Sequence, residues 1–117
     1  MEIYEYGKIA GGELTKLEKY ALTKDPTIQK VSDHAGEEYK VKSWMHYGDS
    51  NAAGQDVDVL TFSDGITVLG TNSRTFIRDF LDIVDIAEGA PFSIEICTGS
   101  TKNNRTYYSC RCVNIDG

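Results

Sequence analysis

The segment Glu38–Tyr47 contains two lysines, a tryptophan and a histidine at every second position. Side chains alternate between the two faces of a β-strand, so a strand here predicts one face that carries all four. They are Lys40, Lys42, Trp44 and His46. Cations neutralise phosphates and flat rings stack on bases, and a surface for single-stranded nucleic acid needs both. This face is therefore the first candidate binding surface.

A second group of candidates lies between Cys97 and Ile115, a stretch without a single acidic residue. Its cations are candidate phosphate contacts, and they act through charge and counterion release rather than base reading. Tyr107 and Tyr108 are neighbours in a predicted strand and cannot both point inward, so we expect one in the core and one available for stacking. The predicted phosphate contacts here are Lys102, Arg105 and Arg111.

The overall charge of the chain opposes long-range attraction of nucleic acid. The net charge is −6, and residues 49–95 contain nine acids against two bases. The summed field has the wrong sign for steering a polyanion. Any nucleic-acid site must therefore be local, and solubility or the guarding of an edge strand is an alternative role for each cation.

Catalytic and metal chemistry find little support in the sequence. Cys110 and Cys112 share one face of a predicted strand, but this spacing differs from that of structural zinc sites, and small buried thiols explain it better. Asp56 and Asp58 are a weak candidate pair for a divalent ion. The sequence contains no recognisable nucleophile–base arrangement and no phosphate-cradling glycine loop. We expect a protein that is not an enzyme and needs no cofactor or metal.

The elements that must position these residues form a β-β-β-α-β-β series in one domain, residues 1–117. Thr71–Ser73 offers capping groups before an amphipathic helix, and Gly89 with Pro91 ends that helix. Residues 1–25 are predicted to form a short N-terminal strand and helix. The order predicts a mainly β fold, a five-stranded OB-like antiparallel barrel with one helix between its third and fourth strands. An α+β sandwich fits the same order.

The cellular compartment follows from composition. No apolar run approaches the roughly 20 residues of a membrane helix. Residues 1–5 resemble no secretory signal, and three cysteines in no disulfide-framework spacing suit a reducing environment. We expect a cytoplasmic protein, with no membrane partner.

Two stretches of sequence, Thr71–Ile77 and Gly99–Tyr107, resemble a small family of phage-encoded single-stranded DNA-binding proteins with an OB fold. Thr71–Ile77 is similar to the family's "T-N-S-x-T-F-I" helix start, which follows a strand and a turn that correspond to Val59–Thr61 and Asp64-Gly65. Gly99–Tyr107 is similar to its "G-x-S-K-x-G-R-x-Y" segment, with Asn103-Asn104 where a glycine is usual. The likeness covers roughly residues 26–113. The long acidic tail of many such proteins is not found after Ile115, so tail-mediated recruitment of replication proteins is not expected.

The resemblance implies a sequence-nonspecific protein that coats single-stranded DNA in phage replication or recombination, in the host cytoplasm. Replication or recombination proteins are the other partners it implies. Residues 66–69 and 1–25 are candidates for a homodimer edge, and the alternative role for them is to cap the barrel. The alternative is an acidic interaction module without nucleic-acid affinity, a phage inhibitor or DNA mimic that presents Asp79, Asp82 and Asp85.

Overall fold

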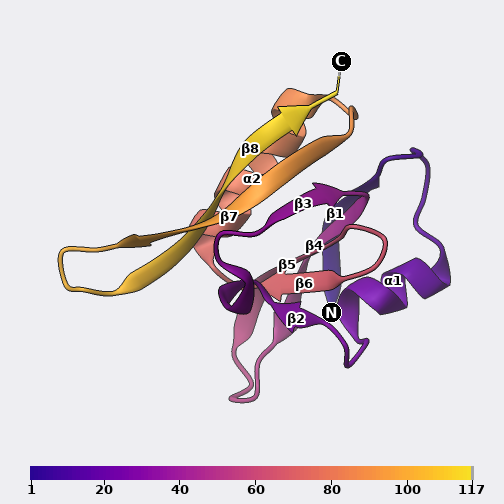
Figure 1. Cartoon of the computed structure of the whole chain (residues 1–117). Helices are drawn as coiled ribbons and strands as arrows, with labels where there is room; N and C mark the ends of the chain where they lie inside the picture. Colours follow the sequence, from indigo (N-terminus) through magenta and orange to yellow (C-terminus); the bar gives the residue numbers. More distant parts are fainter. Residues whose placement is uncertain (117) are drawn as a thin grey trace.

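The computed structural model describes residues 1–116, which form two α-helices, one 3-10 helix and eight strands (Figure 1). Their bounds are β1 Glu2–Lys8, α1 Lys16–Thr23, β2 Gln29–Lys30, η1 Val31–His34, β3 Glu38–Val41, β4 Ser43–Ser50, β5 Asp56–Ser63, β6 Val68–Thr71, α2 Arg74–Ala87, β7 Phe92–Ser100 and β8 Thr106–Ile115. The mainly β character predicted from the sequence is confirmed. Neither helix of this described part has the length and apolar character needed to span a bilayer.

The strands are divided between two sheets. The larger sheet has the order β1-β4-β5-β6-β2, and the smaller has the order β3-β7-β8. All pairs are antiparallel except β2 with β6. Residues 1–116 thus form two open sheets with eight strands, and the strands do not close into a five-stranded barrel. The N-terminal strand β1 is an edge of the larger sheet, so the first residues are part of the main fold.

The predicted strand Glu38–Tyr47 is interrupted at Lys42. Before this residue β3 pairs with β7, and after it β4 pairs with β1 and β5, so the chain passes from one sheet to the other. The Lys42 backbone marks the crossing, because its N–H donates to Ser63 O at 2.8 Å and its carbonyl accepts from Ile9 N at 2.8 Å. Residues on the two sides of the break therefore belong to different surfaces, and the prediction of one continuous cationic face is wrong.

Helix α2 closes the main core against both sheets. Ser73 caps the helix through its Oγ, which accepts from Phe76 N at 3.3 Å. The buried stripe on the helix consists of Phe76, Ile77, Phe80, Ile83 and Ala87, at the spacing of an amphipathic helix. Phe76 and Phe80 stack with Phe62 of β5, at centroid distances of 5.9 and 5.6 Å. This aromatic cluster fixes the helix on the inner face of the larger sheet.

A smaller core lies on the other face of the larger sheet, under α1. Leu14 and Leu22 pack there against Met45 and Tyr47 of β4. The helix begins with a capping box, because the Thr15 hydroxyl accepts from Glu18 N and the Glu18 carboxylate accepts from Thr15 N. Helix α1 covers only part of this face.

Candidate nucleic-acid interface

The indole of Trp44 is a core side chain, so its predicted role as a stacking platform is wrong. Trp44 is only 7% exposed, and its ring meets Phe80 edge to face at a centroid distance of 5.9 Å. A Cβ on Gly7 would come within 2.7 Å of Trp44 Nε1, so the backbone of β1 also lies close to the ring. A nucleobase has no access to the faces of this indole.

His46 also points to the inner side of the larger sheet. Its ring lies 5.0 Å from that of Tyr4, and neither ring nitrogen has a hydrogen-bond partner within residues 1–116. Glu5 Oε1 is the nearest acid, 3.8 Å from Nδ1. The predicted placement of His46 on an open cationic face is therefore wrong.

Three of the predicted phosphate contacts lie apart from the others. Lys40 Nζ is 3.9 Å from Asp116, and Arg111 Nε donates to Glu95 Oε1 at 2.5 Å, a bond that raises the pKa of the guanidinium. The Lys42 side chain lies against Gly65 in the β5–β6 turn. That turn and the β7–β8 loop lie at opposite ends of the molecule in Figure 1. Two of these three cations already have acidic partners.

The other predicted contacts gather on the distal half of the β7–β8 hairpin, residues 98–108, which we call the arm. The arm projects from the rest of the molecule (Figure 1), and Lys102 and Arg105 lie in its exposed tip. Neither forms an ion pair with any residue in 1–116. The tip is closed by a hydrogen bond from Thr101 N to Arg105 O at 2.9 Å. Asn104 has the left-handed φ of 58°, which asparagine adopts more readily than most residues.

Tyr107 and Tyr108 take opposite faces of the arm. Tyr107 is 40% exposed and pairs with Gly99 of β7, where a Cβ would come within 2.3 Å of the phenol ring. The ring therefore lies across the glycine backbone, and this close approach requires a residue without a side chain. Tyr108 is half-buried and packs against the main core at the base of the arm. One tyrosine thus faces solvent and the other faces the body.

An open groove of about 830 Å³ begins beside Tyr108, on the part of the larger sheet that α1 leaves uncovered. We call it the groove. Its floor is the outer face of β4–β6, one wall is the segment 23–32, and the other wall is Asn72, Ser73 and Tyr108. One hydrogen bond ties the floor to α1, and another joins two residues of the second wall. Thr61 Oγ1 donates to Leu22 O at 2.6 Å, and Ser73 Oγ donates to Tyr108 O at 3.0 Å. The floor residues are Tyr47, Val59, Thr61 and Gly70.

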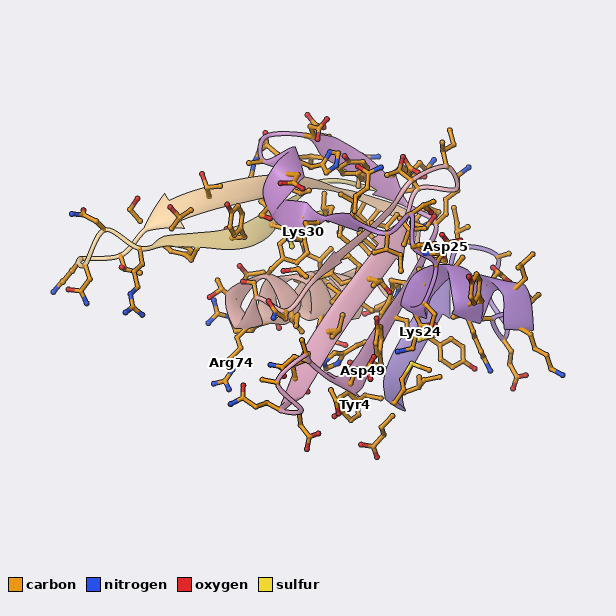
Figure 2. All side chains as sticks on the ribbon, turned by 90° about the horizontal axis from the view of Figure 1, so that it is seen from below. Tyr4, Lys24, Asp25, Lys30, Asp49 and Arg74 are labelled. Atoms are coloured by element: carbon orange, nitrogen blue, oxygen red, sulfur yellow. The ribbon has the colours of Figure 1, made fainter. Side chains whose placement is uncertain are left out.

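Two lysines lie along the wall formed by segment 23–32 (Figure 2). Lys24 Nζ is 2.8 Å from Asp49, and this bond lowers the pKa of the Asp49 carboxyl. Lys30 is exposed and has no ion pair within residues 1–116. Between the two lysines, Asp25 accepts from Thr27 N and Oγ1, which holds the pKa of its carboxyl below the usual range.

The groove and Lys30 were missed by the sequence reasoning. The alternation of Ile28 and Lys30 is typical of a short strand over Thr27–Ser32, but nothing in the sequence indicates the partner of this strand. The observed partner is β6, in a parallel ladder that pairs Lys30 with Gly70. A two-residue parallel pairing leaves no periodicity in the sequence that could reveal it. The residues with the right chemistry were visible, whereas their position beside Tyr108 was not.

The described residues contain no cluster of three or more His, Cys, Asp or Glu side chains that could hold a metal ion. The three cysteines are free thiols, and burial raises the pKa of Cys110 to about 12. Arg78 pairs with Asp79 at 3.2 Å. No protein-family model, curated protein or solved structure matches the chain. The function is therefore argued from the geometry and charge of the arm and the groove.

Proposed function

We propose that the protein binds single-stranded DNA without sequence specificity and acts in phage DNA replication or recombination. The observation that carries the proposal is the arm, an acid-free projection with two free cations at its tip and an exposed tyrosine on its shaft. Phosphate contacts from Lys102 and Arg105 supply affinity, and Tyr107 supplies a ring on which a base can stack.

The charge distribution makes the arm the most favourable place for a polyanion. Half of the 18 acidic residues lie in residues 49–95, where only two bases offset them, whereas residues 97–115 have none. At physiological salt the Debye length is about 8 Å, so the arm's cations are partly shielded from acids elsewhere on the protein. A local basic site can therefore act on a chain whose net charge is −6.

The element order supports an OB-like relationship as part of this proposal. If β3 and β4 are one strand bent at Lys42, the order becomes strand, β5, β6, α2, β7 and β8, with the helix after the third strand. The bent strand pairs with β5 in one sheet and with β7 in the other. We propose an open relative of the OB barrel, in which β7–β8 extends outward as the arm. Loops and strand faces of OB folds commonly bind oligonucleotides.

The alternative, an acidic protein-interaction module, gains no specific support. Of the three aspartates in its proposed array, Asp79 is engaged by Arg78, and only Asp82 and Asp85 are exposed. Two exposed acids on one helix are an ordinary solvated surface.

Fluorescence anisotropy with a labelled oligo-dT at low salt tests the proposal. We expect saturable binding that is reversed by salt, and weaker binding of a duplex of the same length. Intrinsic Trp44 fluorescence should change little, because the indole is buried away from the arm. No binding at low salt would overturn the proposal.

A further inference from the structure

We infer that the groove holds the unstacked bases of the single strand, with Tyr108 as a second stacking surface and Lys30 as the phosphate contact beside it. This inference rests on the proposed function and adds a second contact region to the arm. It differs from the sequence-based prediction, which gave the central role to Trp44 and the cations around it.

The arm and the groove adjoin each other at Tyr108. Tyr108 belongs to β8 at the base of the arm and also lines the groove. Tyr107, the next residue back along the chain, lies on the opposite face of the same strand. Because β8 is the edge strand of its sheet, a strand of nucleic acid that passes from Tyr107 to the groove wraps around this edge to reach Tyr108.

The register of β2 on β6 places Lys30 beside the floor of the groove. Lys30 is paired with Gly70, a floor residue, and the side chains of paired residues emerge on the same face of a sheet. Lys30 therefore rises from the wall over the floor. Its ammonium has no acidic partner within residues 1–116, so a phosphate can bind there without displacing an ion pair.

The residues that line the groove have a chemistry that suits unpaired bases. The floor presents the half-buried Val59 and Gly70, whereas Thr61 is only 1% exposed, and Asn72 adds an exposed amide at the wall. Flat, partly apolar bases suit such a floor, and an amide can bond to their edges. A duplex is excluded, because its bases are already stacked on one another and paired.

The charges around the groove indicate along which of its sides the phosphate backbone of the bound strand runs. In Figure 2, Lys30 and Arg74 lie nearer the arm than Lys24 and Asp25 do. Arg74 lines a small pocket with Asp56 and Asp58, whose carboxylates repel phosphate. Lys24 is already held by Asp49. Within residues 1–116, Lys30 is therefore the one groove cation without an acidic partner, and the phosphate backbone should pass on its side.

A charge-reversal pair tests the contact at Lys30. Lys30→Glu and Lys16→Glu each change the net charge by the same amount at an exposed lysine, but Lys16 lies on α1, outside the groove. We expect Lys30→Glu to weaken binding of labelled oligo-dT about tenfold more than Lys16→Glu does. Equal affinities for the two variants would overturn the inference. A urea melt of each variant checks that both are folded.

Photocrosslinking separates failure of the inference from failure of the proposed function. An oligo-dT with one 5-iodouracil at its centre is bound to the wild-type protein, irradiated and mapped by mass spectrometry of the peptides. We expect the crosslink at Tyr108 or within residues 23–32. Binding with crosslinks confined to Tyr107 would overturn the groove inference and leave the proposed function standing. No binding of the wild-type protein would overturn both.

Discussion

The β3–β4 segment and the arm contain the same kinds of residues in the same alternation, yet one is largely internal and the other is exposed. Trp44 has a lysine two residues before it, and Tyr107 has an arginine two residues before it. Trp44 is 7% exposed and Tyr107 is 40% exposed. Helix α2 covers the strand that carries Trp44, whereas the arm projects beyond the helix (Figure 1). Alternation on a strand determines which residues share a face, but the neighbouring elements determine which face is covered.

The largest effect that tests this comparison is on stability. Replacing Trp44 by alanine should lower the free energy of unfolding by about 3–5 kcal/mol, because it opens a cavity beside Phe80 in the core. Replacing Tyr107 by alanine should cost less than about 1 kcal/mol, since an exposed ring loses little burial. Urea denaturation of both variants measures the difference. Similar losses of unfolding free energy in the two variants would contradict the difference in burial between the Trp44 and Tyr107 rings.

Tyr107, whose replacement should have the smaller effect on stability, should have the larger effect on the affinity for DNA. Tyr107→Ala should lose about 1–3 kcal/mol of binding free energy for oligo-dT, the value of one stacked base. Tyr107→Phe should retain most of it, because the ring remains. Titrations of a labelled oligonucleotide with the three proteins measure the loss. An alanine variant with wild-type affinity would remove Tyr107 from the interface.

Cations with acidic partners should matter less than free ones. Arg111 is held by Glu95, so Arg111→Ala should change affinity by less than about twofold, whereas Arg105→Ala at the arm tip should weaken binding more. The same anisotropy titration compares the two arginine variants. A larger loss for Arg111→Ala would place the contact surface on the shaft of β8 rather than at the tip.

The smallest expected effect is the response of stability to acid. Hydrogen bonds from Thr15 and Lys8 to Glu18 lower the pKa of that carboxyl, and Asp25 and Asp49 have lowered pKa values for similar reasons. A carboxyl with a lowered pKa in the folded state contributes stability at neutral pH, and this contribution is lost as the pH falls through the folded-state pKa. Urea midpoints should therefore fall at acidic pH, and Glu18→Gln should flatten part of the decline. An unchanged pH profile in Glu18→Gln would contradict this assignment.

Much of the local structure could be predicted from the sequence. The capping groups at Thr71–Ser73 and the apolar stripe that includes Phe76 and Phe80 predict α2, and the alternation of Phe92, Ile94 and Ile96 is typical of the strand observed as β7. These signals are local, because each depends on residues within one or two turns of helix or along one strand.

The tertiary arrangement could not be predicted in the same way. The break at Lys42 depends on pairing with β7 and β5, which are distant in sequence. The groove depends on β2 reaching β6 over about 40 residues. The direction in which Trp44 points depends on where α2 packs. Each of these features is decided by contacts between segments that no local pattern records.

The salt dependence of binding tests the central claim, that the arm is the phosphate-binding surface, most directly. The double variant Lys102→Ala/Arg105→Ala is compared with Lys16→Ala/Lys19→Ala, which removes the same charge from α1. We expect the arm variant to bind oligo-dT more weakly and to reduce the slope of log affinity against log salt by about 1.4, about 0.7 for each lost contact with a single-strand phosphate. The α1 variant should retain the wild-type slope. Identical affinities and slopes for the two variants would contradict the account.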